Sequence, residues 1–398
     1  MTEKLFAANS LLRVCTAQVT ACTEMAGKYL IELDRTVFFP EGGGQLSDQG
    51  LLDEVRVSHV STKEGHIYHH CDQPLAVGSQ VMAQLDWPLR LDRMQQHCGE
   101  HLLSWACWKL FGANNVGFHM HEDWVAIDLD KMLTREQLYE AELLTNQVIW
   151  ENRPITVSYV DSKEAANLPG MRKFNDKLEG QLRIVAVEGA DVCTCCGTHP
   201  PATGMVGSVQ LVKAEKHKQG IRVEFLCGRR ALLAARRQNQ LLLELSNQFS
   251  TQVEQVPDHV EKLTREVQSL KERLKGQTLQ LLQAQLQKAY QQAPLRADGV
   301  RLVALVTEEP QAAKLLATSI ESLEQAVVLV INPNPQRLSY LVALGKNTAG
   351  DCREYGKLLN EAWGGRGGGK PNSVQGGAPY CEDWEEKLQG VVQALLEA

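Results

Sequence analysis

The sequence QHCGEHLL at residues 96–103 lies within a periodic run, residues 89–111, that ends at Gly112. The run predicts a long helix, and the octapeptide places His97 and His101 four residues apart. Positions i and i+4 lie on one face of a helix, so both imidazoles can reach the same ion. On its own, this spacing is more typical of solvated or packed histidines than of metal ligands.

A second segment, CTCCGTH at residues 193–199, places Cys195 four residues before His199, around a glycine. A tight loop of this kind could bring a thiolate and a third imidazole to the ion. Three histidines and one cysteine form a tetrahedral set of the donor types that zinc prefers. The two segments together predict a zinc site, and the alternative is a pair of unrelated buried clusters.

Glu100 lies between the two histidines of the first segment, but it does not follow the first histidine directly. The HExxH pattern of metalloproteases requires a glutamate at that position. The sequence therefore argues against a protease.

The composition is that of a globular protein with two or three domains, because the 398 residues are 43% hydrophobic. The sequence contains no apolar run as long as a membrane-spanning helix requires, and its N-terminus lacks the features of a signal peptide. Eleven cysteines, an odd number, indicate free thiols in a reducing compartment rather than a disulfide framework. We therefore expect a soluble cytoplasmic protein.

The net charge of −7 argues only weakly against a nucleic-acid partner, because the charge is unevenly distributed. Residues 1–227 contain 21 Lys and Arg against 29 Asp and Glu, whereas residues 228–293 contain 10 against 6. A basic segment can bind a polyanion even in an acidic protein.

Residues 1–90 predict a barrel-like β subdomain that contains a glycine-rich loop. Alternating runs broken by Gly, Pro and Asp predict strands at residues 12–18, 28–33, 50–60, 66–70 and 79–85. Between the second and third runs lies TVFFPEGGGQLSDQG, residues 36–50. Three consecutive glycines let the backbone approach a ligand closely, and the aromatic pair, the proline and Gln45 favour an ordered ligand-facing loop over a flexible hairpin. The candidate substrate-binding residues of this loop are Thr36, Gly42, Gly43 and Gly44.

Residues 91–227 predict an α+β domain that holds the zinc site. A second helix is expected at residues 134–150, where Thr134 and Gln137 form a capping box. Apolar runs predict strands at residues 155–160, 182–187, 206–214 and 221–226. Because the CTCCGTH loop falls between strands, the metal would join a helix to a sheet.

Residues 228–293 predict a helical linker of two helices. The first covers residues 231–249, and the second is expected to begin at Pro257 with Asp258 as its cap. Apolar residues of the second helix form a heptad seam at positions 260, 263, 267, 270 and 274, and the seam resumes out of phase after Gly276. Such helices form a hairpin or dimerise. The first helix carries arginines on one face, at positions 229, 230, 236 and 237. That face is either exposed to solvent or in contact with RNA.

Residues 294–398 predict a small α/β domain with a glycine-rich loop. The expected strands are at residues 300–306, 326–331 and 339–345. The expected helices are at residues 311–323, 352–363 and 385–398. The stretch WGGRGGGKPNSVQGGA at residues 363–378 is predicted to form a loop. Its backbone N–H groups, with Arg366 and Lys370, could bind phosphate, although the P-loop pattern is absent.

Three segments, TVFFPEGGGQLSDQG, QHCGEHLLSWA and RIVAVEGADVCTCCGTH, resemble in order and spacing the editing domain of alanyl-tRNA synthetases and its free-standing relatives, the AlaX-type editing proteins. The resemblance covers residues 1–227. The glycine-rich stretch near the C-terminus is similar to the C-terminal domain of those synthetases, a tRNA-binding and dimerising module. Together the two similarities imply the long-form AlaX architecture.

The resemblance implies a zinc-dependent hydrolase that deacylates tRNA(Ala) mischarged with serine or glycine. Its zinc ligands would be His97, His101, Cys195 and His199. Gln45 would lie beside the aminoacyl group and Asp191 would support the metal loop, and with Glu100 these are the candidate catalytic residues. A homodimer through the helical linker or the C-terminal domain is also implied. We expect no adenylate-forming domain, because the motifs begin near residue 36.

Two positions depart from the relatives. Cys196 replaces a glycine, so either Cys195 or Cys196 could be the thiolate ligand, and Glu100 replaces Thr or Gln, which could alter specificity. Four protein ligands are also typical of closed structural zinc sites. Two alternatives therefore stay open: a deacylase of different amino-acid specificity, and a non-catalytic, zinc-stabilised tRNA-binding protein.

Overall fold

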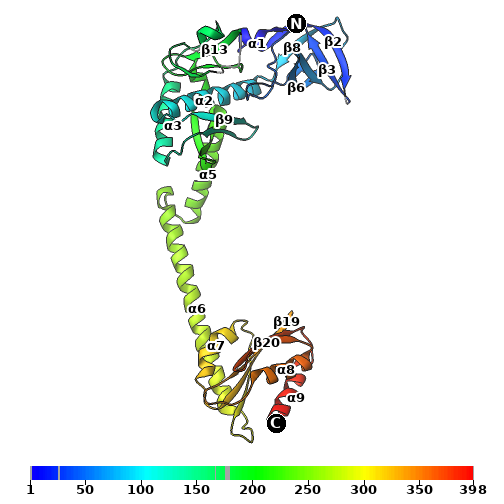
Figure 1. Cartoon of the computed structure of the whole chain (residues 1–398), viewed down its shortest axis with the longest axis vertical. Coiled ribbons are helices and arrows are strands. Elements are labelled where there is room, and N and C mark those ends of the chain that lie inside the picture. The colour runs from blue at the N-terminus through cyan, green and yellow to red at the C-terminus, as the bar shows by residue number, and fades with distance from the viewer. Residues whose placement is uncertain (1, 26, 166, 175–179, 398) are drawn as a thin grey trace. The chain divides into compact units, whose positions relative to one another are not determined.

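The computed structural model describes residues 2–25, 27–165, 167–174 and 180–397. The chain divides into two compact units, Met1–Leu245 and Ser246–Ala398, and Figure 1 shows the elements of each. Both units combine helices with sheets, so the predicted α+β class is confirmed. The finer division into four parts stays a prediction.

In the first unit, the N-terminal strands close into a barrel in the order β2-β3-β7-β6-β5-β8 (Figure 1). These strands are β2 (Val14–Met25), β3 (Lys28–Leu33), β5 (Gly50–Leu52), β6 (Val55–Lys63), β7 (His66–Cys71) and β8 (Gln80–Leu85). Buried and more exposed side chains alternate along β7 and β8, as expected where one face of each strand points inward. The predicted strand at residues 50–60 is two strands, because Asp53 adopts a left-handed conformation, with φ of 52°, in the turn between β5 and β6.

Short elements precede and follow the first barrel strands. They are β1 (Glu3–Lys4), α1 (Leu5–Ala8) and β4 (Arg35–Thr36), and β1 pairs with β4 in parallel. Aliphatic side chains fill the barrel, and Ile31, Val57 and Ile67 are fully buried. The glycine-rich loop begins directly after β4.

The helix predicted around the two histidines is α2 (Trp87–Phe111). It begins at Asp86, whose side chain accepts a hydrogen bond from the Leu89 N–H, and ends at Gly112, whose φ is 59°. An N-cap acceptor and a left-handed glycine are the termini that such a helix needs. Every residue from Gln96 to Cys107 is buried, so the central turns of α2 contact protein on all sides.

Helices α2 and α3 (Arg135–Trp150) pack together against a four-stranded antiparallel sheet. Its strands, in order, are β15 (Val209–His217), β16 (Gly220–Cys227), β10 (Val125–Leu129) and β9 (Asn115–Met120). The capping box at Thr134 and Gln137 is confirmed. Strands β9 and β10 are not among the predicted strands, although β10 is buried throughout.

A second sheet of the first unit carries the CTCCGTH segment. Its strands, in order, are β11 (Ile155–Asp161), β13 (Gln181–Val187), β14 (Val192–Thr194) and β12 (Met171–Lys173), and a short helix α4 (Ser162–Ala165) follows β11. The predicted strand at residues 206–214 begins only at Val209, because Thr203–Val206 form the 3-10 helix η1.

Helices α5 (Gly228–Gln248) and α6 (Val256–Gln292) correspond to the predicted linker, with the 3-10 helix η2 (Val253–Gln255) before α6. The prediction that Asp258 caps the second helix is wrong: the capping position is Gln255, and no side chain closes that end. Helix α6 continues through Gly276. Its later leucines, Leu282 and Leu286, are 2% exposed within the core of the second unit, whereas the heptad seam before Gly276 is 42–65% exposed.

The second unit contains a five-stranded sheet covered by helices. Its strands, in order, are β17 (Arg301–Val306), β18 (Ala326–Asn334), β19 (Arg337–Leu344), β21 (Ser373–Ala378) and β20 (Arg366–Lys370). The helices are α7 (Ala312–Glu321), α8 (Cys352–Trp363) and α9 (Trp384–Glu397). All the strands and helices predicted for this part are present, with ends shifted by a few residues.

The glycine-rich stretch of the second unit is a β-hairpin, so its prediction as a loop is wrong. Strands β20 and β21 pair antiparallel, and Tyr340 on β19 lies opposite Gly376. A Cβ on Gly376 would lie 2.3 Å from the Tyr340 hydroxyl, and one on Gly367 would lie 2.5 Å from it. The tyrosine ring therefore fills the space that the glycines leave, which lets a stretch of low β propensity form the last two strands of the sheet.

Among the described residues, no helix combines the length and the apolar content that crossing a membrane requires.

Candidate metal centre and active site

Four predicted ligands meet inside the first unit. Helix α2 supplies His97 and His101, and the loop after β14 supplies Cys195 and His199. Their ligand atoms all lie within 4.8 Å of one another. The Cys195 Sγ is 3.0 Å from His97 Nε2 and 3.3 Å from His199 Nε2. The three histidines are 1–6% exposed, so the cluster lies in the protein interior.

Cys195 is the cysteine of this cluster, and Cys196 is exposed. A tight turn brings the loop so close to the helix that a Cβ on Gly197 would lie 2.6 Å from His97 Nε2. Arg183 fixes the turn by donating hydrogen bonds to the Cys195 and Gly197 carbonyls at 2.7 and 2.9 Å. Only glycine at position 197 allows this close approach.

Asp191 orients one of the histidines. Its Oδ2 lies 3.0 Å from His101 Nδ1, and Arg172 donates to its two oxygens at 2.6 and 3.0 Å. Burial alone would raise the pKa of Asp191, but His101 and Arg172 hold that pKa well below its usual value. The ionised carboxylate fixes Nδ1 as the donor, which leaves His101 Nε2 free to face an ion.

Cys193 adds a second thiol to this side of the cluster. Its Sγ lies 3.1 Å from His101 Nδ1, and His101, Asp191 and Cys193 form a second group with metal-ligand spacing. Burial raises the pKa of Cys193 to about 11, so its thiol stays protonated near neutral pH. Cys193 therefore neighbours the four-residue cluster as a neutral thiol.

The ionisation of Cys195 and His199 suits a cation. Burial would raise the pKa of Cys195, but the three histidines lower it well below its usual value. Burial lowers the pKa of His199 to about 4. A thiolate and a neutral imidazole are the forms that bind metals.

The spacing of the donor atoms is close to that of a tetrahedral site. Ligands about 2.0–2.3 Å from an ion lie roughly 3.4 Å apart, close to the measured 3.0 and 3.3 Å. The Nδ1 atoms of His97 and His199 are buried without hydrogen-bond partners in the described chain, so these two rings contact the cluster through Nε2, facing Cys195. The cluster fits, and could hold, a metal ion.

The glycine-rich loop packs directly onto the metal loop. Gly42 and Gln45 close a turn, and the Gln45 side chain exchanges two hydrogen bonds with Thr198, at 2.8 and 2.9 Å. A Cβ on Gly44, whose φ is 81°, would lie 2.6 Å from Phe118, and the Phe118 ring in turn contacts His97. Gln45 therefore ties two distant segments together beside the cluster.

Known proteins resemble both parts of this site. The family described as "tRNA synthetases class II (A)" matches residues 7–89, and "Threonyl and Alanyl tRNA synthetase second additional domain" matches residues 182–224. The alanyl-tRNA editing protein AlaX-L of Pyrococcus horikoshii is 29% identical, over 67% of this chain and 72% of its own length. The mouse alanyl-tRNA editing protein Aarsd1 is 29% identical, over 94% of this chain and 89% of its own length. Over most of its length, this chain is therefore similar to the AlaX-type editing proteins.

Longer relatives align with it as well. The alanine–tRNA ligase of Pyrococcus abyssi is 28% identical over 92% of this chain, which spans 41% of the ligase. The solved C-Ala domain of Aquifex aeolicus alanyl-tRNA synthetase matches 26% of this chain and 96% of its own length, with 15% identity and a TM-score of 0.23. A TM-score this low does not establish a shared fold.

Glu100 lies at the edge of the cluster. Its Oε1 accepts hydrogen bonds from Ser104 and Asn115 at 2.8 and 2.6 Å, while its Oε2 lies 3.8 Å from His101 Nε2. One oxygen therefore anchors the side chain, and the other faces the histidine atom that would bind the ion.

The remaining predicted site residues are not among the four ligands or their hydrogen-bond partners described so far. Thr36 is fully buried and shares a hydrogen bond of 2.8 Å with His69 Nε2 inside the barrel. Gly43 lies in the turn, with φ of 60°. Arg366 and Lys370 lie on β20 of the second unit and are exposed. Their substrate-binding roles stay predictions.

Arg172 and Thr198 are contacts of the cluster that the sequence did not indicate. Arg172 lies 19 residues before its partner Asp191, and no local pattern marks it. Thr198 lies inside the CTCCGTH segment, where only its position between Gly197 and His199 gives a signal.

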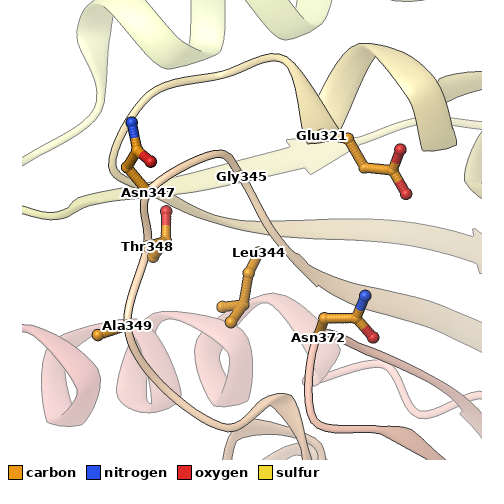
Figure 2. A pocket seen from close by; sticks show the side chains of 7 residues that line it. All are labelled: Glu321, Leu344, Gly345, Asn347, Thr348, Ala349 and Asn372. Carbon is orange, nitrogen blue, oxygen red and sulfur yellow. The ribbon is translucent and has the colours of Figure 1, made fainter.

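The second unit has an open pocket of about 520 Å³ beside β19 (Figure 2). Its lining side chains include Asn347, Thr348 and Asn372, and Glu321 is its one titratable residue. Neither a metal-ligand set nor a buried charge lies in this pocket, so it offers no comparable chemistry.

Proposed function

We propose that the protein is a trans-editing hydrolase that deacylates mischarged seryl-tRNA(Ala), and also glycyl-tRNA(Ala), with zinc held by the four-residue cluster. The observation that carries the proposal is the convergence of three imidazoles and one thiol within 4.8 Å in the interior. The printed names of the relatives AlaX-L and Aarsd1, both alanyl-tRNA editing proteins, support the substrate class.

The donor set favours zinc among the common metals. His97, His101 and His199 would supply nitrogen, and Cys195 would supply sulfur, which are the ligand types zinc prefers. A bound zinc polarises an ester carbonyl or lowers the pKa of water. The remaining steps rest on residues of the chain itself.

Glu100 would transfer the proton in this proposal. A water oxygen attacks the ester carbonyl carbon, and the Glu100 Oε2 accepts the water proton. The bond from that carbon to the ribose oxygen then breaks, and the proton passes to the ribose oxygen. The products are the free amino acid and a tRNA with an intact terminal hydroxyl. The Oε1 contacts with Ser104 and Asn115 keep Oε2 oriented during both transfers.

Gln45 would hold the two loops in position and would take no part in bond making or breaking. Both ends of its amide are engaged by Thr198, so it holds the glycine-rich loop and the metal loop at a fixed separation. Preference for serine over alanine follows from polarity, because a site that hydrogen-bonds the serine hydroxyl leaves a buried polar group unpaired when alanine binds; polarity does not account for the release of glycine, which also lacks the hydroxyl. Correctly charged tRNA would then be spared.

The test is deacylation of tRNA(Ala) charged in turn with serine, glycine and alanine, before and after chelation of the protein. We expect serine to be released faster than alanine, and we expect chelation to abolish release. Equal release of all three amino acids would contradict the specificity, and release unaffected by complete metal removal would contradict the zinc mechanism.

One observation favours a second candidate. Four protein ligands fill a tetrahedron, as in structural zinc sites. The second candidate is a zinc-stabilised protein that binds tRNA without hydrolysis. It predicts stoichiometric zinc and tRNA binding with no release of any of the three amino acids.

A further inference from the structure

Arg93 is a buried cation without a full set of partners. It lies on α2 and is 3% exposed, and neither its Nε nor its Nη1 has a hydrogen-bond partner in the described chain. Burial lowers its pKa, but an arginine remains charged at neutral pH. Charged groups buried without partners are costly, so this guanidinium is unusual within the first unit.

Two other arginines of the first unit, Arg90 and Arg230, have structural roles, with a hydrogen-bond partner at each guanidinium nitrogen. Arg90 donates to both oxygens of Asp48 and to the carbonyls of Ser10 and Val37. Arg230 forms a bidentate pair with Asp92 and donates to the His121 carbonyl. Both of these guanidinium groups use their hydrogen-bonding capacity within the chain, whereas the Nε and Nη1 atoms of Arg93 have no partner in the described residues.

Arg93 lines a cavity of about 210 Å³ that also contacts the glycine-rich loop. Polar groups of the lining include Ser47, Gln49, His59 and His121. Glu41 and Glu122 also line the cavity, but both are exposed and neither bonds to Arg93. The buried end of the cavity therefore carries the Arg93 guanidinium, near the already paired carboxylates of Asp48 and Asp92, and the rim is acidic.

The cavity lies next to the metal cluster. Arg93 precedes His97 by four residues, so it lies on the same face of α2, about 6 Å along the axis. At the rim, His121 stacks on Trp124 with ring centroids 4.1 Å apart, and Trp124 is 36% exposed. A deep cation beside an exposed aromatic pair is the arrangement that binds a nucleotide by its phosphate and its base.

We infer that Arg93 binds a backbone phosphate of the RNA 3′ end and so places the terminal ester at the metal cluster. The guanidinium fork matches two phosphate oxygens with two parallel hydrogen bonds. The identity of the RNA rests on the proposed function, whereas the phosphate contact rests on Arg93 alone. Arg93 is thus a substrate-positioning residue and takes no part in proton transfer.

The test compares binding of two uncharged minihelices that carry the tRNA(Ala) acceptor stem and an unpaired CCA end. One has normal phosphodiesters, and the other has uncharged methylphosphonates at the last two linkages. Fluorescence anisotropy of the full chain gives both affinities. We expect the wild-type protein to prefer the phosphodiester by about tenfold or more, the gain typical of charge-assisted hydrogen bonds, and Arg93→Gln to bind both equally.

Three controls keep the result interpretable. Arg135→Gln removes the same charge from an exposed arginine that stacks on Tyr139 and should keep the wild-type preference. Arg93→Lys should recover part of the preference, since it restores charge without the fork. Unchanged metal content and circular dichroism of Arg93→Gln would show that its fold is intact.

Several outcomes would overturn the inference. No preference in the wild-type protein, or a preference that Arg93→Gln retains, would exclude a phosphate contact at this residue. Tight binding of inorganic phosphate that depends on Arg93, without any preference between the minihelices, would assign the cavity to a free anion instead. A phosphate preference in a protein that releases no amino acid would contradict the proposed activity and leave the Arg93 contact standing.

Discussion

The two glycine-rich segments of this chain differ in what fills the space beside their glycines. In the first unit, residues 42–45 form a turn, and Gln45 joins that turn to the loop that carries Cys195 and His199. In the second unit, the ring of Tyr340 occupies the room beside Gly376. The first segment therefore brings two loops together at a cluster of ionisable groups, whereas the second makes room for a core side chain.

This difference shows that glycine has two structural roles here, which cannot be told apart in the sequence. A glycine near a functional group allows the backbone to approach it, as Gly197 does at His97 Nε2. A glycine in a sheet can instead accept an aromatic ring from the neighbouring strand. Composition alone cannot distinguish the two, because the deciding partner comes from elsewhere in the chain.

The largest expected effect comes from removing the thiolate beside the first segment. Cys195→Ala should lower metal affinity by more than about 100-fold, since even residues that only orient metal ligands contribute about 10–100-fold. Deacylation should fall with it. Metal analysis by plasma mass spectrometry, alongside the seryl-tRNA assay, measures both.

Cys196→Ala is the matched control for that experiment. Cys196 is exposed, so its variant should keep the metal and the activity. Stoichiometric metal in Cys195→Ala, or its loss in Cys196→Ala, would show that the cluster is not the metal site described above.

The next largest effect concerns the barrel that supports the first segment. His69 donates from Nδ1 to the Ile31 carbonyl and accepts from the Thr36 hydroxyl at Nε2, and burial lowers its pKa to about 4. Because the folded pKa lies below the unfolded value of about 6.5, its stabilising contribution is complete above pH 6.5 and is lost as the pH falls toward 4. The barrel should lose about 2 kcal/mol between pH 7 and pH 5 from this residue.

Hydrogen exchange of the β3 and β7 amides, corrected for intrinsic rates, measures that loss. In His69→Gln the pH dependence over this range should become flatter, even if the variant is less stable at pH 7. An equally steep dependence in both proteins would assign the acid sensitivity to other groups.

A smaller effect is expected from filling the space in the second segment. Gly376→Ala would place a Cβ 2.3–2.6 Å from the Tyr340 ring, and overpacking of this kind costs about 1–3 kcal/mol. Gly368→Ala, which meets no atom within 4 Å, should change stability by less than about 0.5 kcal/mol. Thermal unfolding of the two variants tests the contrast, and equal melting temperatures would show that Tyr340 does not depend on the glycine.

The sequence predicted those parts of the molecule whose signal is local. The periodic run that ends at Gly112 indicated α2, the spacing of His97 and His101 placed two imidazoles on one face of it, and the capping box indicated α3. The hairpin β20–β21 was missed because glycine has low strand propensity, and only Tyr340 makes that conformation favourable. Strands β9 and β10 are short and joined by a polar turn, and β10 is buried throughout, so its sequence shows no alternation.

The cluster itself was predictable only in part. The donor types and their spacing indicated the four ligands, but Arg172 is brought to Asp191 by the pairing of β12 with β14. The sequence likewise shows several arginines along α2 and α5 but cannot show that Arg93 alone of Arg90, Arg93 and Arg230 lacks a carboxylate partner. Partners that are distant in the chain decide these contacts, and propensity and periodicity do not report them.

The smallest expected effect tests whether the second segment binds RNA in spite of its structural glycines. Arg366 and Lys370 are exposed at the two ends of β20, where each could contact one phosphate. Arg366→Gln with Lys370→Gln should weaken tRNA binding by a few-fold and reduce the slope of log affinity against log salt by roughly two, about one per lost contact. Lys357→Gln with Lys387→Gln, which removes two cations from α8 and α9, is the control for net charge. A salt slope lowered equally by both pairs would mean that the hairpin contributes charge without a specific contact, and its glycines would then serve only the packing of Tyr340.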